Sequence, residues 1–239
     1  MDYLLVHGAW HGAWVWDQVG AHLRAQGHRV HVVELASHGA VGTPIGGLYD
    51  DADIVRTALT EIGCPVVVVG HSYGGAVITE AVTDAAEVRQ LVYLAAFMPE
   101  PGQSILDVIG GKPPLWWMPS PNGRTVTVDR PKALFYNDCD DATADAAVAR
   151  LQPQSLASLV QPTSVAAWRE IPSTYIVCLK DGAGSPEVQR AIGSRARRLL
   201  EIDSGHTPQL SKPGVLAEVL GSLALEPPDP MASALAEHL

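Results

Sequence analysis

Cysteine is scarce in this chain of 239 residues, which has three, at Cys64, Cys139 and Cys178. Three cysteines far apart, with no Cys-x-x-Cys pair, give neither a disulfide framework nor a thiolate metal site. The sequence also lacks the His-Glu-x-x-His spacing of zinc proteases and the Gly-x-Gly-x-x-Gly spacing of dinucleotide-binding proteins. We therefore predict no metal and no nucleotide cofactor.

Basic residues are also few, because 16 Lys and Arg stand against 26 Asp and Glu, for a formal net charge of −10. Such an acidic chain disfavours nucleic acid and anionic membrane surfaces as partners. No apolar run approaches the length of a membrane span, and no basic segment with an apolar stretch behind it precedes the first strand-like residues. We expect a soluble, cytoplasmic protein.

Short apolar runs alternate with helix-length segments of mixed polarity, a pattern typical of a mostly parallel sheet with helices on both faces. The apolar runs predict about six strands, at Tyr3–Val6, Val30–Glu34, Val66–Val69, Gln90–Ala95, Thr174–Leu179 and Leu199–Ile202. The segments between them predict helices at about 15–26, 51–62, 73–84, 187–194 and 213–224. The fold class is therefore α/β.

This alternation breaks between Phe97 and Ile171, where prolines are frequent and no central strand is evident. Helical patches around 141–151 and 154–160 favour a helical lid over the sheet, a common site for substrate-binding elements. We thus predict a core of residues 1–96 and 172–225, a lid of residues 97–171 and a surface tail of residues 226–239.

The strongest chemical signal is Gly70-His71-Ser72-Tyr73-Gly74-Gly75, directly after one predicted strand and directly before a predicted helix. A Gly-x-Ser-x-Gly pattern is weak alone, but between strand and helix it indicates a nucleophile elbow and hence the α/β-hydrolase fold. The glycines allow strand and helix to approach closely, which exposes Ser72 above the sheet. The alternative, a serine in an ordinary turn, is less consistent with this context.

A nucleophilic serine needs a base, and His206 is the best candidate among nine histidines. It follows the last predicted strand, at the sheet edge that carries Ser72. In this fold the acid lies between serine and histidine in the chain, and Asp181 follows a strand in that interval. Asp203 is the rival, although it lies only three residues before His206.

The oxyanion hole of such a site is formed by two backbone N–H groups. We predict that Tyr73 supplies one and Ala9, in the loop after the first strand, supplies the other. Aromatic and apolar residues that could line a substrate pocket are Trp10, Trp116, Trp117 and Met118. The alternative for the lid residues is that they only pack the lid against the core, as Phe135 and Tyr136 are expected to do.

Three segments together resemble a known group of enzymes: Val6–Trp14, the elbow Gly70–Gly75, and Ser204-Gly205-His206 with Leu210-Ser211-Lys212-Pro213. They are similar to the plant hydroxynitrile lyases, to the related methylesterases of salicylate and jasmonate, and to bacterial esterases. The likeness spans nearly the whole chain. It implies the triad Ser72, Asp181 and His206, donors at Ala9 and Tyr73, no cofactor, and frequent homodimers.

The lyases of this group use a threonine in the first-strand loop and a lysine beside the catalytic histidine. The matching positions here are Gly8 and Thr207, which offer neither the hydroxyl nor the cation that would stabilise departing cyanide. Gly8 instead leaves room in the pocket for an ester carbonyl and water. We therefore favour a serine esterase that cleaves a small carboxylic ester through an acyl-enzyme.

Other chemistries use the same residues and stay open at this point. A lactone or thioester hydrolase, or a cyclase in a biosynthetic pathway, would need the same triad. A lyase-like enzyme is disfavoured by Gly8 and Thr207, and a ligand-binding protein that retains the fold would not need an intact triad. The expected partner in each case is a small molecule.

Overall fold

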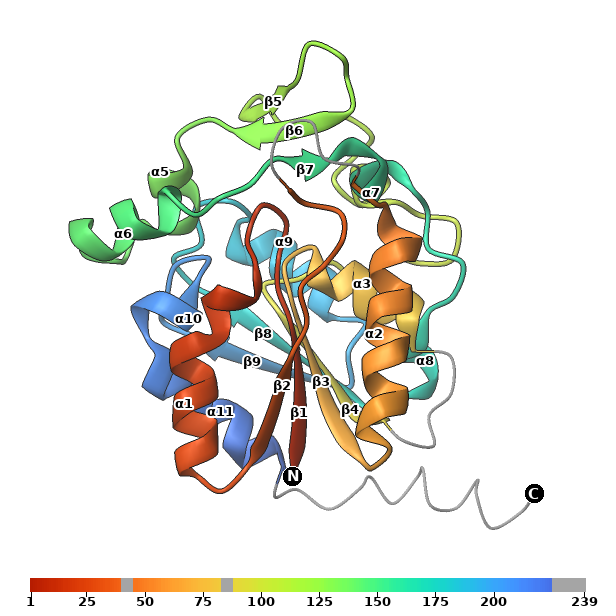
Figure 1. Ribbon diagram of the computed structural model, residues 1–239, viewed down its shortest axis with the longest axis vertical. Coiled ribbons are helices and arrows are strands. Elements are labelled where there is room, and N and C mark those ends of the chain that lie inside the picture. Colours follow the sequence, from red (N-terminus) through yellow and green to blue (C-terminus); the bar gives the residue numbers. More distant parts are fainter. Residues whose placement is uncertain (40–44, 83–87, 225–239) are drawn as a thin grey trace.

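The computed structural model describes residues 1–39, 45–82 and 88–224. Within these residues the main sheet has six parallel strands in the order β2-β1-β3-β4-β8-β9 (Figure 1). They are β1 (Asp2–Val6), β2 (Arg29–Val32), β3 (Val66–His71), β4 (Val88–Leu94), β8 (Ser173–Cys178) and β9 (Arg198–Ile202). All six predicted strands are confirmed, and no end differs by more than two residues.

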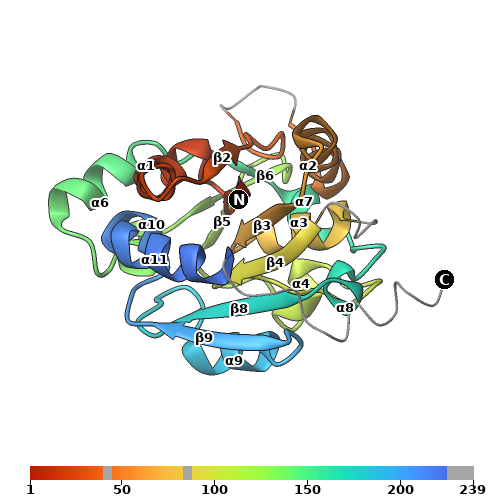
Figure 2. The ribbon, with the colours of Figure 1, turned by 90° about the horizontal axis from the view of Figure 1, so that it is seen from below.

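Helices cover both faces of this sheet (Figure 2). One face carries α1 (Asp17–Ala25) and α11 (Pro213–Ala224), and the other carries α2 (Leu48–Ile62), α3 (Gly74–Ala81) and α9 (Pro186–Gly193). A 3₁₀ helix, η1 (Ala13–Trp16), leads into α1, and the short α10 (Pro208–Ser211) precedes α11. The predicted helices are confirmed, except that α3 ends at Ala81 and Val82 is already extended, whereas residues 83 and 84 lie outside the described residues.

The run Val66–Val69 shows why the sheet is buried on both sides. Val66 and Val68 belong to the apolar core under α2 and α3, whereas Val67 and Val69 belong to the core under α1 and α11. Alternate side chains of a strand point to opposite faces, so a continuous β-branched run suits a doubly covered strand. The register pairs Val6 of β1 with Gly70 of β3, which brings the two following loops together at one edge.

Residues 95–172, between β4 and β8, form a segment that we call the insertion. Most of it lies over the carboxyl ends of the main strands, whereas α8 lies lower, at the side of the sheet (Figure 1). Its helices are α4 (Ile105–Val108), α5 (Pro131–Phe135), α6 (Asp141–Val148), α7 (Leu156–Val160) and α8 (Ala167–Glu170). It also contains an antiparallel sheet of β5 (Trp117–Pro119), β6 (Thr125–Val128) and β7 (Gln154–Ser155).

The lid is therefore mixed, which corrects the prediction of a helical one. The predicted helical patches coincide with α6 and α7, but strands of two to four residues are too short to show a period of two. The tail 226–239 lies outside the described residues. Across the described part of the chain, no helix combines the length and apolar character that crossing a membrane requires.

Candidate active site

Ser72 occupies the turn between β3 and α3 with a φ of 52°, in the left-handed region. This conformation costs a non-glycine residue about 1–2 kcal/mol. A Cβ atom on Gly70 would lie 2.6 Å from the carbonyl oxygen of Gly74, and one on Gly74 would lie 2.7 Å from that of His7. Glycine at both positions thus permits the close approach of strand and helix that forces the turn, as the motif predicts.

His206 and Asp181 meet although they follow different strands, β9 and β8. The Nδ1 atom of His206 lies 2.7 Å from Oδ2 of Asp181, and the two side chains are 7% and 1% exposed. Because a carboxylate only accepts, Nδ1 carries the proton and Nε2 keeps the lone pair that a general base needs. Both residues line the same cavity as Ser72, so the structure brings the three predicted catalytic residues together.

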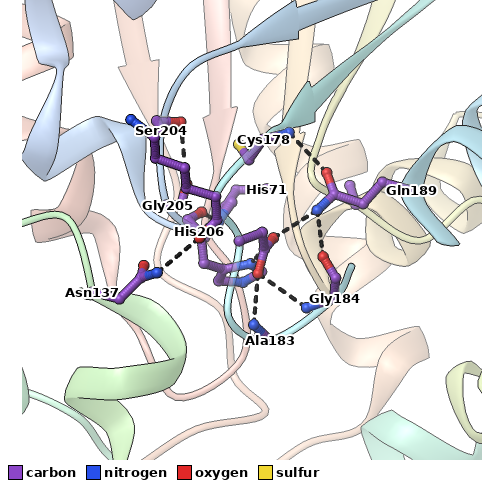
Figure 3. A network of polar contacts seen from close by, with 12 residues as sticks. His71, Asn137, Cys178, Ala183, Gly184, Gln189, Ser204, Gly205 and His206 are labelled. Atoms are coloured by element: carbon purple, nitrogen blue, oxygen red, sulfur yellow. Dashed lines mark hydrogen bonds and ion pairs between the residues drawn. The ribbon is translucent and has the colours of Figure 1, made fainter. Parts of the chain in front are cut away.

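The carboxylate of Asp181 is held by further hydrogen bonds (Figure 3). Its Oδ1 accepts from the backbone N–H groups of Ala183, at 2.7 Å, and Gly184, at 3.0 Å, while Oδ2 accepts from Nε2 of Gln189 at 2.8 Å. The Gln189 amide is fixed in turn, since its Oε1 accepts from the N–H of Cys178. The orientation of the acid is therefore set before any substrate binds. Gln189 was not predicted.

Asp203, the rival acid, faces solvent. Its side chain is 61% exposed and forms ion pairs with Lys180, at 2.8 Å, and Lys212, at 3.5 Å. The hydrogen bond from Lys180 lowers the pKa of Asp203 below its usual value. No hydrogen bond joins it to His206 within the described residues, so the geometry favours Asp181 as the acid.

Two residues that the sequence did not single out hold the His206 loop. The buried ring of His71 donates through Nε2 to the carbonyl oxygen of His206 at 2.9 Å, and burial keeps the pKa of His71 well below its usual value. From the insertion, Oδ2 of Asp138 accepts from the N–H of Gly205 at 2.7 Å. His71 could have been suspected from its place beside Ser72, whereas nothing in the sequence marks Asp138.

The two predicted oxyanion donors, Ala9 and Tyr73, both line the cavity. Within the described residues, neither backbone N–H donates to another protein group. The loop after β1 is shaped by Trp10, whose φ of 64° is again in the left-handed region. The arrangement leaves two N–H groups beside Ser72, as binding of an oxyanion requires.

The cavity has a volume of about 570 Å³ and is mostly apolar. Its walls come from the edge of the main sheet, from α9 and from the insertion. Besides the residues already named, they include Ile105, Val108, Ile109, Trp116, Trp117, Leu159, Tyr175, Val188 and Ile192. No lysine or arginine occurs among the described lining residues. Trp10, Trp116 and Trp117 line it, as predicted.

Two expectations about the pocket need correction. Met118 is 51% exposed and does not line the cavity, because it follows the buried Trp117 on β5 and alternate residues of a strand face opposite ways. Gly8 is not a lining residue either, and a Cβ atom there would meet Nδ1 of His71 at 3.0 Å and Cβ of Ser72 at 3.1 Å. Phe135 is buried in the core, as expected, and it also lines the cavity, with its ring centroid 5.4 Å from that of His206.

One group of side chains, His7, Glu34 and His38, has the spacing of metal ligands, with its donor atoms within 4.8 Å of one another. In His7, however, Nδ1 donates to the carbonyl oxygen of Gly8 at 2.9 Å, and Nε2 accepts from the N–H of Leu35 at 3.1 Å. Both ring nitrogens are therefore occupied. We assign no metal to this group.

Comparison with known proteins agrees with this geometry. The chain is 31% identical over 247 residues to a probable hydrolase, R7, of Phoma sp., a match that covers 92% of this chain and 97% of the relative. It is 30% identical over 253 residues to Methylesterase 7 of Arabidopsis thaliana, covering 93% and 95%. A crystal structure of a pyrethroid hydrolase from Sphingobium faniae superposes with a TM-score of 0.82 at 26% identity, covering 95% and 98%.

The plant methylesterase belongs to the group that the sequence motifs resemble, so that resemblance is confirmed. The model of the alpha/beta hydrolase family matches residues 3–219, which include all three predicted catalytic residues and the whole main sheet except Asp2. The chain therefore belongs to the alpha/beta hydrolase family.

Proposed function

We propose that this carboxylic ester hydrolase acts as a serine hydrolase, with Ser72 as nucleophile, His206 as general base and Asp181 as the acid. The observation that carries the proposal is the buried 2.7 Å contact between His206 and Asp181, beside a cavity that Ser72 also lines. A serine hydroxyl is a poor nucleophile at neutral pH and needs a base of this kind.

The reaction has two acyl-transfer steps. Oγ of Ser72 attacks the ester carbonyl carbon while Nε2 of His206 takes the hydroxyl proton, and Asp181 stabilises the resulting imidazolium. The N–H groups of Ala9 and Tyr73 stabilise the oxyanion. The protonated His206 then gives its proton to the departing alkoxide, which leaves Ser72 acylated. A water molecule, activated by His206, attacks the acyl carbon and releases the carboxylic acid.

The lining of the cavity supports a neutral ester with a sizeable apolar part. Pockets of about 300–1,000 Å³ suit ligands of drug-like size, and this one is walled by aromatic and aliphatic side chains. The names of the relatives point the same way, because one is a methylesterase and another a pyrethroid hydrolase. The same machinery would serve for a lactone or a thioester.

A cyanohydrin lyase is disfavoured by two observations. Thr207, at the position of the lyase lysine, is fully buried and does not line the cavity. Without a lysine or arginine among the described lining residues, a departing cyanide anion would have no cation to stabilise it in an apolar pocket. Release of cyanide from mandelonitrile would contradict this assignment.

The first test is hydrolysis of p-nitrophenyl esters of increasing acyl length by the wild type and by Ser72→Ala. We expect the variant to lose turnover by about 10⁴–10⁶-fold, because the triad acts as a unit. Circular dichroism and thermal melting serve as controls for folding. Retention of more than a few per cent of the activity would contradict the role of Ser72 as nucleophile.

A second readout does not depend on guessing the substrate. A fluorophosphonate should add one equivalent to the wild type at Ser72, located by mass spectrometry, and none to Ser72→Ala. Labelling without p-nitrophenyl ester hydrolysis would mean that Ser72 is a competent nucleophile but that the cavity does not accept these esters. No labelling at Ser72 under any condition would contradict the proposed mechanism.

A further inference from the structure

A buried amide from the insertion holds the backbone beside one proposed oxyanion donor. Gln154, in β7, is 1% exposed, and its Oε1 accepts from the N–H of Trp10 at 3.0 Å. Its Nε2 donates to the hydroxyl oxygens of Ser37 and Ser158, each at 2.7 Å. The amide therefore has both ends satisfied, and its position is fixed by residues from three parts of the chain.

A buried carboxylate continues this network toward the other proposed donor. Oδ1 of Asp51, in α2, accepts from the N–H groups of Ala36 and Ser37 at 2.7 and 3.0 Å. Its Oδ2 accepts from the hydroxyl of Tyr73 at 2.6 Å. Asp51 and Ser37 are fully buried, so no bulk water competes for these hydrogen bonds.

The two ends of the network are thus the two residues that shape the oxyanion hole. Trp10 follows Ala9 directly, and Tyr73 is itself the second donor. The Ala9–Trp10 peptide group is held at both poles, because Gln154 accepts its N–H and His11 donates through Nδ1 to its carbonyl oxygen at 2.8 Å. The insertion also binds the carbonyl oxygen of Trp10, through the N–H of Gln152 at 2.9 Å.

This double anchoring matters because Trp10 has a φ of 64°. A tryptophan rarely adopts the left-handed region unless its surroundings require it. Relaxation of this φ would redirect the chain at Ala9 and so displace the N–H of Ala9, which belongs to the preceding Gly8–Ala9 peptide group. Hydrogen bonds that lie outside the loop itself are what hold the strained conformation. Gln154 provides the one that reaches the peptide N–H.

We propose that Gln154 and Asp51 are positioning residues, which hold the Ala9 and Tyr73 N–H groups at a fixed separation around Ser72 through the path Trp10–Gln154–Ser37–Asp51–Tyr73. The inference rests on the proposed function, since it assigns these residues a role in stabilising the oxyanion. It also links the insertion to the rate of the chemical step, because β7 supplies the amide.

The main test is Gln154→Leu, which keeps the approximate size of the side chain and removes the acceptor for Trp10. Loss of one oxyanion donor costs about 10²–10³-fold in kcat, and misplacing it should cost about 10–100-fold. We expect that fall in kcat with KM changed by less than about threefold, because the ester still fills the same cavity.

Gln90→Leu is the matched control. It makes the same substitution in β4, where Nε2 of Gln90 donates to the hydroxyl oxygen of Thr174 at 2.7 Å. This hydrogen bond lies in the part of the sheet far from the carboxyl ends of the strands and from Ser72. This variant should keep the wild-type kcat even if its stability falls. Urea unfolding of both variants identifies conditions under which each is fully folded during the assay.

Two further measurements separate positioning from a merely structural role. A trifluoromethyl ketone forms a tetrahedral oxyanion adduct with the serine, so its inhibition constant should rise in Gln154→Leu in parallel with the loss in kcat/KM. The inhibition constant of the product carboxylic acid, which forms no such adduct, should change by less than about threefold. Gln154→Glu retains an acceptor for Trp10 but loses the donor to Ser37 and Ser158, so its kcat should lie between those of Gln154→Leu and the wild type.

The outcomes are distinguishable from failure of the proposed function. If the wild type shows Ser72-dependent hydrolysis but folded Gln154→Leu keeps its kcat, the positioning role is wrong and the serine mechanism stands. An equal rise in the inhibition constants of the ketone and of the product acid would also contradict the positioning role, because it would indicate a general change in the cavity. If the wild type has no Ser72-dependent activity or labelling, the proposed function itself fails.

Discussion

The two sides of Ser72 are held in different ways. On the acid–base side, His206 and Asp181 are 25 residues apart in the chain and both follow strands of the main sheet. On the oxyanion side, the backbone of Trp10 is bonded to Gln154, 144 residues away in the insertion. The main sheet thus carries the proposed acid–base pair, whereas the insertion bonds to the loop that carries one of the two proposed oxyanion donors.

This difference bears on how the substrate preference of such an enzyme can change. An insertion that only covered the cavity could be altered without affecting the chemistry. Here the same segment lines the cavity with Trp116 and Trp117 and bonds to the oxyanion loop through Gln154. Substitutions that reshape the cavity can therefore change the rate as well as the choice of ester.

The largest expected effect lies on the acid–base side of Ser72. Asp181→Asn and its control, Asp203→Asn, test which carboxylate acts as the acid. Replacing the triad acid by its amide should lower kcat by about 10⁴-fold, because the amide no longer stabilises the imidazolium or the correct tautomer. Asp203→Asn removes only exposed ion pairs and should change kcat by less than about twofold. Steady-state kinetics on one p-nitrophenyl ester measures both.

Asp203→Asn serves as the control for charge, since both variants lose one carboxylate near the same loop. The reverse ranking would reassign the acid to Asp203 and would move the acid–base side to the surface. Equal, small effects would mean that neither carboxylate orients His206, although Asp181 contacts it directly.

The acid–base side could be predicted from the sequence because its signals are local. The β-branched run Val66–Val69 identifies a buried strand, and the glycines around Ser72 identify the turn that follows it. Chain order then selects His206 and Asp181. In the structure both follow parallel neighbouring strands, whose carboxyl ends meet at one edge.

The oxyanion side could be predicted only in part. Ala9 and Tyr73 follow from the motif, but the residues that hold them do not. Gln154 lies in a strand of two residues, and neither periodicity nor charge distinguishes it from any other glutamine. The same limitation explains Met118, because one residue of register in the short β5 decides between the cavity and solvent.

The turn that carries Ser72 adjoins both the acid–base residues and the oxyanion loop. Gly74→Ala tests how tightly this turn packs against the oxyanion loop. The new Cβ would lie 2.7 Å from the carbonyl oxygen of His7, in the loop after β1, and 2.8 Å from that of Val6, the last residue of β1. Overpacking of this kind costs about 1–3 kcal/mol in the free energy of unfolding. Urea denaturation measures this cost.

Gly214→Ala is the matched control, because its Cβ would meet only the His22 ring at 3.8 Å, an ordinary contact. It lies in α11, where alanine favours the helix, and it should leave stability unchanged or slightly higher. Stability in Gly74→Ala equal to that of the control would mean that the loop after β1 moves freely relative to the elbow.

The smallest expected effect concerns His11, which links the oxyanion loop to the insertion. Its Nδ1 donates to the carbonyl oxygen of Ala9, and its Nε2 accepts from the hydroxyl of Tyr136 at 2.8 Å. Burial lowers the pKa of His11 to about 3. The folded state therefore holds a neutral ring, while the unfolded chain binds a proton below about pH 6.5, so stability falls as the pH falls through that range.

For one such histidine the free energy of unfolding should drop by about 1.5 kcal/mol between pH 6.5 and pH 5. His7 and His71 act with the same sign, because burial lowers their pKa values too, whereas Asp51, whose pKa burial raises, acts against them. His11→Gln keeps an acceptor for Tyr136 but does not titrate. Its unfolding free energy should therefore depend less steeply on pH than that of the wild type.

His22→Gln, at an exposed position of α1, is the control for the loss of a histidine. Urea unfolding at half-unit intervals of pH gives the three profiles. A profile for His11→Gln parallel to that of the wild type would show that the ring is hydrated in the folded state. The loop would then be held to the insertion only through Trp10, by Gln152, Gln154 and Val126, which would make the effect of Gln154→Leu on kcat the larger.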